Sequence, residues 1–245
     1  LGDTTIGDRS SPVLVVGNHI FVELDAGGLH TVARKANGQV WAWGQNVNGQ
    51  LGDNTGSNRS SPVLVVGTHS FVEVDAGEVH TVARKADGSV WAWGQNTNGQ
   101  LGDNSITARS SPVLVVGSHS FTAIACGNRH TLALKANGQV WAWGYALHGQ
   151  IGDDQFQIPD RSSPSLVAGN HSFVDVSGGW EFSLARKASG EVWAWGNNTL
   201  YGQLGDNTGT NRNSPVLVVG THSFVEVAGG FFHSLARKAS GEVWA

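Results

Sequence analysis

The sequence predicts an all-β fold, a β-propeller of four-stranded blades, on three observations. A motif that begins LGDTTIGDRSSPVLVVG at Leu1 returns at Leu51 and Leu101, with further copies at Ile151 and Leu204, so the chain repeats about every 50 residues. Each copy alternates apolar and polar residues in short runs, a pattern typical of strands. Asn-Gly, Asp-Gly or Ser-Gly separates the last two runs, and such pairs favour two-residue hairpin turns. No run has helical periodicity.

The repeats define the expected blades and a single domain, 1–245. Their bounds are 1–50, 51–100, 101–150, 151–203 and 204–245. In the second repeat we expect strands at 63–66, 71–75, 81–85 and 90–93, with Pro62 at a strand entrance, where a missing N–H is tolerated. One such sheet has too little chain to cover both of its faces, so it must pack against its neighbours. Radial packing gives a propeller, and a linear β-solenoid is the alternative.

Composition excludes several classes of protein. With 40% hydrophobic residues and 10 Trp, the chain can form a core, which argues against disorder. Its one cysteine, Cys126, excludes an internal disulfide framework or a cysteine-cluster metal site. The net charge of −4 comes without a basic run, so we expect no nucleic-acid partner. No apolar stretch is long enough for a membrane helix, so we expect no membrane insertion.

The repeat resembles that of a known family. The segments AGxxHTVARKxxG and VWAWGQNxNGQLGDN, and best of all the residues from Ala125 to Gly144, are similar to the regulator of chromosome condensation (RCC1-like) repeat. The resemblance implies a propeller, most often of seven blades, closed by strands from opposite chain ends. Because the chain has five repeats and no Met, we expect an excerpt of a longer chain. A smaller ring and an open arc are the alternatives.

Recurring Trp, His and Asp residues suggest three ligand or sensor functions, and each has a structural alternative. Light sensing, implied by a plant photoreceptor of the same family, would need Trp at positions where only Trp180 stands, so we expect the paired tryptophans to be core. Repeated His residues could bind a metal, but we expect them to hydrogen-bond a neighbouring loop backbone. The 53–58 loop could bind calcium, but Asx turns explain its composition.

No catalytic constellation is visible, and we predict that the chain is not an enzyme and needs no cofactor or metal. Ser60 and Ser61 have no base beside them, and neither GxSxG nor a phosphate-binding Gly-rich loop occurs. The repeated carboxylates Glu23, Glu73, Asp175 and Glu226 are expected at solvated or inter-blade positions. A lyase or glycosidase that uses paired carboxylates on the rim is the enzymatic alternative.

Variable loops break the repeat symmetry in repeats three to five, where they become aromatic or bulky. Exposed aromatic residues with an Arg are typical of protein interfaces. We therefore predict a partner-binding loop patch, the alternative being that these side chains pack under neighbouring blades. The patch consists of Arg129, Tyr145, Leu147, His148, Phe156, Trp180, Glu181, Tyr201, Phe231 and Phe232, with Ile158 and Leu200 beside them.

These observations favour a non-catalytic scaffold that presents propeller loops to a protein or glycan partner. A composition rich in Gly, Asn, Ser and Thr favours an extracellular, cell-surface or virion-associated location over the cytoplasm. The family resemblance implies an alternative function, guanine-nucleotide exchange on a small GTPase. Exchange would require a unique cluster of carboxylates and polar groups on one face, and the sequence does not reveal such a cluster.

Overall fold

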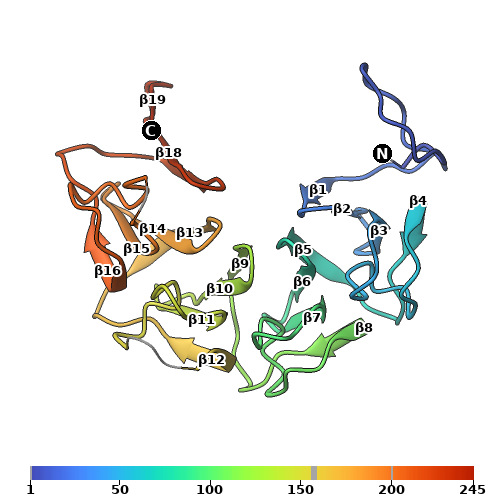
Figure 1. Cartoon of the computed structure of the whole chain (residues 1–245), viewed down its shortest axis with the longest axis horizontal. Helices are drawn as coiled ribbons and strands as arrows, with labels where there is room; N and C mark the ends of the chain where they lie inside the picture. Colours follow the sequence, from blue (N-terminus) through green and yellow to red (C-terminus); the bar gives the residue numbers. More distant parts are fainter. Residues whose placement is uncertain (1, 156–158, 200) are drawn as a thin grey trace.

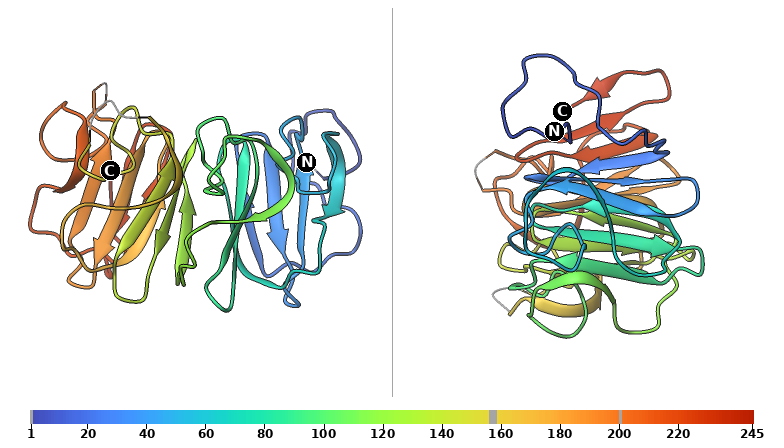
Figure 2. Two further views of the ribbon diagram at one scale, coloured as in Figure 1. Left: turned by 90° about the horizontal axis from the view of Figure 1, so that it is seen from below. Right: turned by 90° about the vertical axis from the view of Figure 1, so that its right-hand side faces the viewer.

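The computed structural model describes residues 2–155, 159–199 and 201–245, and every regular element in these ranges is a β-strand. Nineteen strands form four four-stranded sheets and one three-stranded sheet, all antiparallel. Figure 1 shows these sheets following one another around a common axis, and Figure 2 shows them side by side from two further directions. The predicted all-β propeller architecture is therefore confirmed.

The strands of each blade follow one another in the sheet in chain order, and the first strand lies nearest the axis. Blade 1 contains β1 (Glu23–Ala26), β2 (His30–Arg34), β3 (Val40–Gly44) and β4 (Arg59–Leu64). Blade 2 contains β5 (Phe71–Ala76), β6 (His80–Lys85), β7 (Val90–Gly94) and β8 (Arg109–Leu114). Blade 3 contains β9 (Ala123–Cys126), β10 (His130–Leu134), β11 (Val140–Gly144) and β12 (Arg161–Leu166). Blade 4 contains β13 (Phe173–Gly178), β14 (Phe182–Lys187), β15 (Val192–Gly196) and β16 (Arg212–Leu217), and blade 5 contains β17 (Glu226–Gly229), β18 (Ser234–Arg237) and β19 (Val243–Trp244).

Blade boundaries do not coincide with repeat boundaries, so the expectation that one repeat forms one blade is wrong. The outer strand β4 belongs to the second repeat but pairs with β3 of the first, with Leu64 opposite Trp41 and Arg59 opposite Gly44. Pro62 lies inside this strand rather than at its entrance, and an outer-edge position tolerates its missing N–H. As a consequence of this offset, residues 13–16 form no strand and the fifth blade has three strands.

The hydrophobic core lies between blades. One buried cluster joins Val32, Val40 and Leu51 with Phe71 and Trp93, which belong to the next blade. The second Trp of each pair is buried as predicted, and the Trp93 indole donates a hydrogen bond to the Gln50 carbonyl at 2.9 Å. Each sheet thus buries its apolar side chains against its neighbour, which is the reason that this repeat folds as an array.

The strand register places two sets of loops on one face of the propeller. In blade 2, His80 at the start of β6 pairs with Gly94 at the end of β7, so residues 77–79 and 95–108 lie at the same end of the sheet. The hairpin turn at Asp87-Gly88 lies at the opposite end. We call the first end, in all five blades, the loop face.

Candidate functional site

Four predicted patch residues form one aromatic cluster on the loop face, on blades 4 and 5. The Trp180 and Phe231 ring centroids lie 3.6 Å apart, and those of Phe231 and Phe232 lie 4.3 Å apart in an edge-on arrangement. Tyr201 packs against Phe232 at 4.8 Å. Tyr201 is 60% exposed, Phe231 49% and Phe232 39%, so these rings contact each other and keep much of their surface open to solvent. We call these four residues the aromatic cluster.

A polar group lies next to the aromatic cluster on blades 3 and 4. His148 Nε2 is 3.2 Å from Glu181 Oε2, which also accepts a hydrogen bond from the Asn197 side chain at 2.9 Å. The Tyr145 ring meets His148 edge-on at 6.0 Å, and burial, followed by the charge of Glu181, raises the pKa of its hydroxyl. Leu147 is exposed on the same loop.

The remaining predicted residues separate into two cases. Arg129 lies on the loop face with its Nε 3.7 Å from Glu78 Oε2, which is too far for a hydrogen bond. Phe156, with Ile158 and Leu200, lies outside the described residues.

Backbone hydrogen bonds between blades fix one position of the short loop after each inner strand. The amide of Gly28 donates to the Glu78 carbonyl, that of Glu78 to the Asn128 carbonyl, and that of Trp180 to the Gly230 carbonyl, at 3.1 to 3.2 Å. Gly28, Glu78, Asn128 and Trp180 are repeat equivalents, and Phe231 holds the same position in blade 5. Gly77 precedes this position, where a Cβ would come within 2.8 Å of the Gly127 carbonyl oxygen of the next blade. The variable residues are therefore held side by side around the axis.

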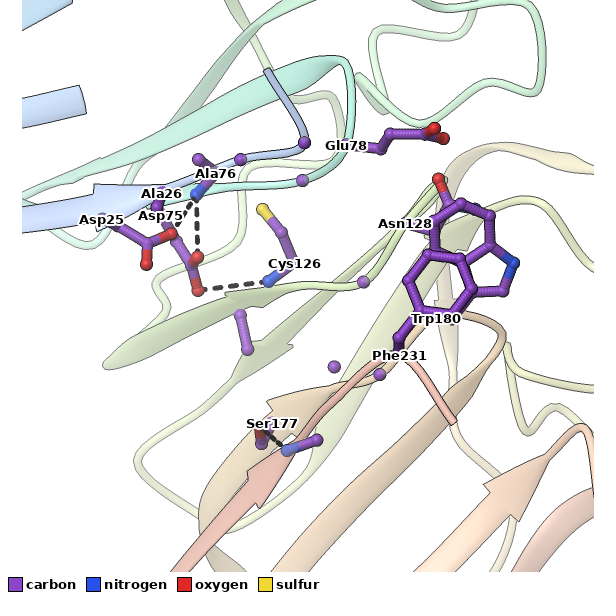
Figure 3. Close-up of a pocket in the computed structure, with 18 of the residues that line it drawn as sticks. Asp25, Ala26, Asp75, Ala76, Glu78, Cys126, Asn128, Ser177, Trp180 and Phe231 are labelled. Carbon is purple, nitrogen blue, oxygen red and sulfur yellow. Dashed lines mark hydrogen bonds between the residues drawn. The ribbon is translucent and has the colours of Figure 1, made fainter. Parts of the chain in front are cut away.

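The axis of the propeller is a cavity of about 950 Å³, lined by the inner strands and these loops of all five blades. Trp180 and Phe231 belong to its lining, so the cavity is continuous with the aromatic cluster (Figure 3). Its charged lining residues are Asp25, Asp75 and Glu78, and no Lys, Arg or His contributes to the lining. The described cavity is thus acidic, with aromatic rings at the loop face.

Asp25 and Asp75 each bind the neighbouring blade. Ala76 N–H donates to Asp25 Oδ2 at 2.7 Å, and Cys126 N–H donates to Asp75 Oδ2 at 3.2 Å (Figure 3). Burial and the adjacent Asp25 carboxyl raise the pKa of Asp75, and burial with both carboxyls raises the pKa of the Cys126 thiol. Sequence reasoning missed this pair, although its signal was present because later repeats have Ala125, Ser177 and Ala228 at the same position.

The repeated histidines connect blades through side chains, which corrects the expectation of loop-backbone partners. His30 Nε2 hydrogen-bonds Thr81 Oγ1 at 3.0 Å, and the Thr81 hydroxyl donates to the Gln50 carbonyl at 2.9 Å. The other series of His residues packs on tryptophan, as His69 does on Trp91 at 4.4 Å. Within the described ranges, no group of three or more His, Cys, Asp or Glu side chains has metal-binding geometry.

The acidic loops and the repeated carboxylates have structural roles. In the 53–58 loop, Asp53 accepts a hydrogen bond from Thr55 N–H, which forms an Asx turn, and further hydrogen bonds from the side chains of Asn46 and Arg59. Glu23 accepts a hydrogen bond from Val74 N–H of the next blade at 3.3 Å, which places it between blades.

Five sheets around an axial cavity, with variable loops on one face, define a β-propeller repeat protein. The family model of the RCC1-like domain matches residues 1–245, and the chain belongs to this family. Human WBSCR16 superposes with a TM-score of 0.81 at 22% identity, over 91% of this chain and 59% of that one. Prp20p from Saccharomyces cerevisiae superposes with a TM-score of 0.81 at 21% identity, over 90% of this chain and 56% of that one. The CRINKLY WD40 ectodomain of the Arabidopsis thaliana receptor kinase ACR4 superposes with a TM-score of 0.59 at 16% identity, over 98% of this chain and 70% of that one.

The chain spans less than two thirds of the length of WBSCR16 or Prp20p. A comparison with curated protein sequences finds no match. No helix that could cross a membrane occurs in the described part of the chain.

Proposed function

We propose that the chain is a non-catalytic propeller that binds a protein through its loop face. The observation that carries this proposal is the aromatic cluster, in which Tyr201, Phe231 and Phe232 are exposed while touching one another. Large aromatic side chains on a rigid support are typical of the residues that dominate protein interfaces, because they bury much apolar area at little entropic cost. The fixed loop backbone described above provides that support.

A protein partner is favoured over a glycan. Glu181 follows Trp180 in the chain and pairs with His148, and Arg129 lies on the same face, so the loop face combines apolar rings with polar and charged groups, as protein interfaces do. Prp20p, a structural neighbour, is described by its binding to Gsp1p and histones, and yeast RCC1 (Prp20) is described bound to Kap60. These are partners of Prp20, and for the present chain they support only a protein as the class of partner.

Replacing the cluster tests this proposal. The variant Trp180→Ser/Phe231→Ser/Phe232→Ser should lose at least 100-fold in affinity for a purified partner, with a melting temperature within about 4 °C of the wild type. A matched control replaces three similarly exposed leucines at the ends of outer strands, Leu114, Leu166 and Leu217, with Ser. Equal partner binding by the two variants would refute the proposal. A large drop in the melting temperature of the triple aromatic variant would show that its rings belong to the hydrophobic core.

Nucleotide exchange on a small GTPase is the second candidate, and one observation favours it. Exchange requires a cluster of carboxylates and polar groups, and the axial cavity brings together Asp25, Asp75 and Glu78. Release of a fluorescent GDP analogue from candidate small GTPases tests this function directly. Acceleration by the chain that disappears in Glu78→Gln would favour exchange over scaffolding alone.

A further inference from the structure

The axial cavity lacks hydrogen-bond donors for two of its acceptors. Glu78 Oε2 and Asn128 Oδ1 are both buried without a hydrogen-bond partner, and Asn128 is only 6% exposed. The loops that carry the two residues are adjacent, because Glu78 N–H donates to the Asn128 carbonyl at 3.1 Å. Figure 3 shows Asn128 next to the Trp180 ring and Glu78 on the adjacent loop. A buried acceptor without a donor is costly, so this arrangement favours a ligand that brings N–H groups.

Charge narrows the class of ligand. Asp25, Asp75 and Glu78 are the titratable side chains with a carboxyl group in the described lining, and burial beside Asp25 favours the neutral form of Asp75. The nearest cation of the chain, Arg129, is 46% exposed and its Nε stays 3.7 Å from Glu78 Oε2. Carboxyl groups gathered in a concave site attract a cation more strongly than one isolated exposed carboxylate does.

The aromatic rings select the shape of the cation. Trp180 and Phe231 line the cavity, and their rings pack against each other with centroids 3.6 Å apart and planes tilted by 32°, which places aromatic surface at the loop-face end of the cavity. A guanidinium group is planar, stacks on indole and carries five N–H donors in one plane. An ammonium group has the charge but neither the flat face nor the planar fork of donors.

We propose that the cavity binds an arginine side chain of the protein partner, with its guanidinium between Glu78, Asn128 and the Trp180 ring. This inference rests on the proposed function and identifies the part of the partner that enters the propeller. A volume of about 950 Å³ accommodates an arginine side chain with its flanking backbone. Asp25 and Asp75 lie on the inner strands, and the raised pKa of Asp75 leaves this pair with less negative charge than two free carboxylates would have.

A peptide titration of the full chain tests the proposal. The probe is a blocked hexapeptide with one central arginine, and its reference replaces that arginine by citrulline, which keeps the shape and removes the charge. Calorimetry should show the arginine peptide binding at least tenfold more tightly. Equal affinities would overturn the proposal, and spermidine binding as tightly as the arginine peptide would overturn the choice of guanidinium.

Variants locate the site and predict effects of opposite sign. Glu78→Gln and, independently, Asn128→Ser should each weaken arginine-peptide binding about tenfold. Arg129→Gln should strengthen it, because it removes the cation that competes for Glu78. Glu191→Gln is the matched control, since it makes the same charge change on the hairpin turn of blade 4, away from the loop face. Circular dichroism establishes that each variant folds, and unchanged affinity in folded Glu78→Gln and Asn128→Ser would overturn the site.

The outcome is separable from that of the proposed function. If the partner loses binding to the triple aromatic variant but binds Glu78→Gln and Asn128→Ser normally, the loop face is the interface and the arginine site is wrong. If the arginine peptide binds the wild type as predicted, and the partner binds the triple aromatic variant as tightly as the wild type, the cavity site stands and the proposed interface fails.

Discussion

Buried imidazoles connect neighbouring blades. His80 Nε2 lies 3.1 Å from Thr131 Oγ1, and the Thr131 hydroxyl donates to the Gln100 carbonyl at 3.0 Å, so the imidazole must be the donor through Nε2. Its Nδ1 is buried without a partner. Burial, followed by the charges of His30 and His130, lowers the pKa of His80 to about 3. Burial likewise lowers the pKa of His30 to about 4 and that of His130 to about 4.

Acid should therefore destabilise the blade contacts. Between the unfolded pKa of 6.5 and the folded value, the unfolded chain binds more protons, so stability is present above pH 6.5 and falls as the pH drops. Each imidazole contributes a slope of about 1.4 kcal/mol per pH unit. His80→Phe imitates blade 4, where Phe182 holds the same position fully buried. Denaturant titrations at several pH values between 6 and 4.5 give the unfolding free energy at each pH. In His80→Phe, this free energy should fall less steeply with decreasing pH, by about 1.4 kcal/mol per pH unit.

His233→Phe provides the control for this measurement. His233 is the fifth-blade equivalent, and its side chain is exposed. The two variants share the chemical change and differ in burial. An equal loss of slope in both variants would contradict the assignment to buried imidazoles.

At the scale of the element, the hairpin turn of each of blades 1 to 4 also joins two blades. Gly88 lies in the turn between β6 and β7 with φ of +83°, and its carbonyl accepts a hydrogen bond from Phe121 N–H of blade 3 at 2.9 Å. A Cβ at this position would meet Ser120 Oγ and lie 2.8 Å from Phe121 N. The turn therefore requires glycine for its backbone conformation and for the approach of the next blade.

A pair of alanine substitutions separates these two requirements. Gly241 occupies the same turn in blade 5 with φ of +92°, and a Cβ there meets nothing within 4 Å. Gly241→Ala should cost about 1 to 2 kcal/mol of local stability for the positive φ alone. Gly88→Ala should cost about 2 kcal/mol more, because the neighbouring backbone must shift. Amide hydrogen exchange of β18 and of β6 measures each effect locally, and equal costs would show that the blade contact contributes little.

The sequence predicts elements better than it predicts their neighbours. The hairpin at Asp87-Gly88 and the burial of Trp93 follow from local chemistry, namely the turn dipeptide and strand alternation. The repeat period alone does not show whether the strand around Pro62 pairs with the next strand of its own repeat or with the last strand of the preceding repeat. The axial cavity was missed for a related reason, since Asp25 and Asp75 are 50 residues apart and meet only through the rotation between blades. The patch was predicted because Trp180 and Phe231 break the repeat symmetry.

At the scale of the whole molecule, each repeat completes the blade before it. Strand β12 comes from the fourth repeat and pairs with β11 of the third, with Leu166 opposite Trp141. Val167, just after β12, is 3% exposed and belongs to the core between blades 3 and 4. Adjacent blades therefore share both chain and core, and cutting at a repeat boundary separates an outer strand from its sheet.

Two fragments of nearly equal length test this arrangement. Fragment 21–168 contains three complete blades, whereas fragment 1–150 lacks β12 and carries residues 13–16, which form no strand. In fragment 1–150, β11 has an unpaired edge and Trp141 loses its partner, so fragment 21–168 should melt higher by about 5 to 15 °C. Thermal melts followed by circular dichroism measure the difference, and size-exclusion chromatography should show more self-association for fragment 1–150. Equal melting temperatures would mean that a blade is stable with three strands and that the shared strand contributes little to cohesion between repeats.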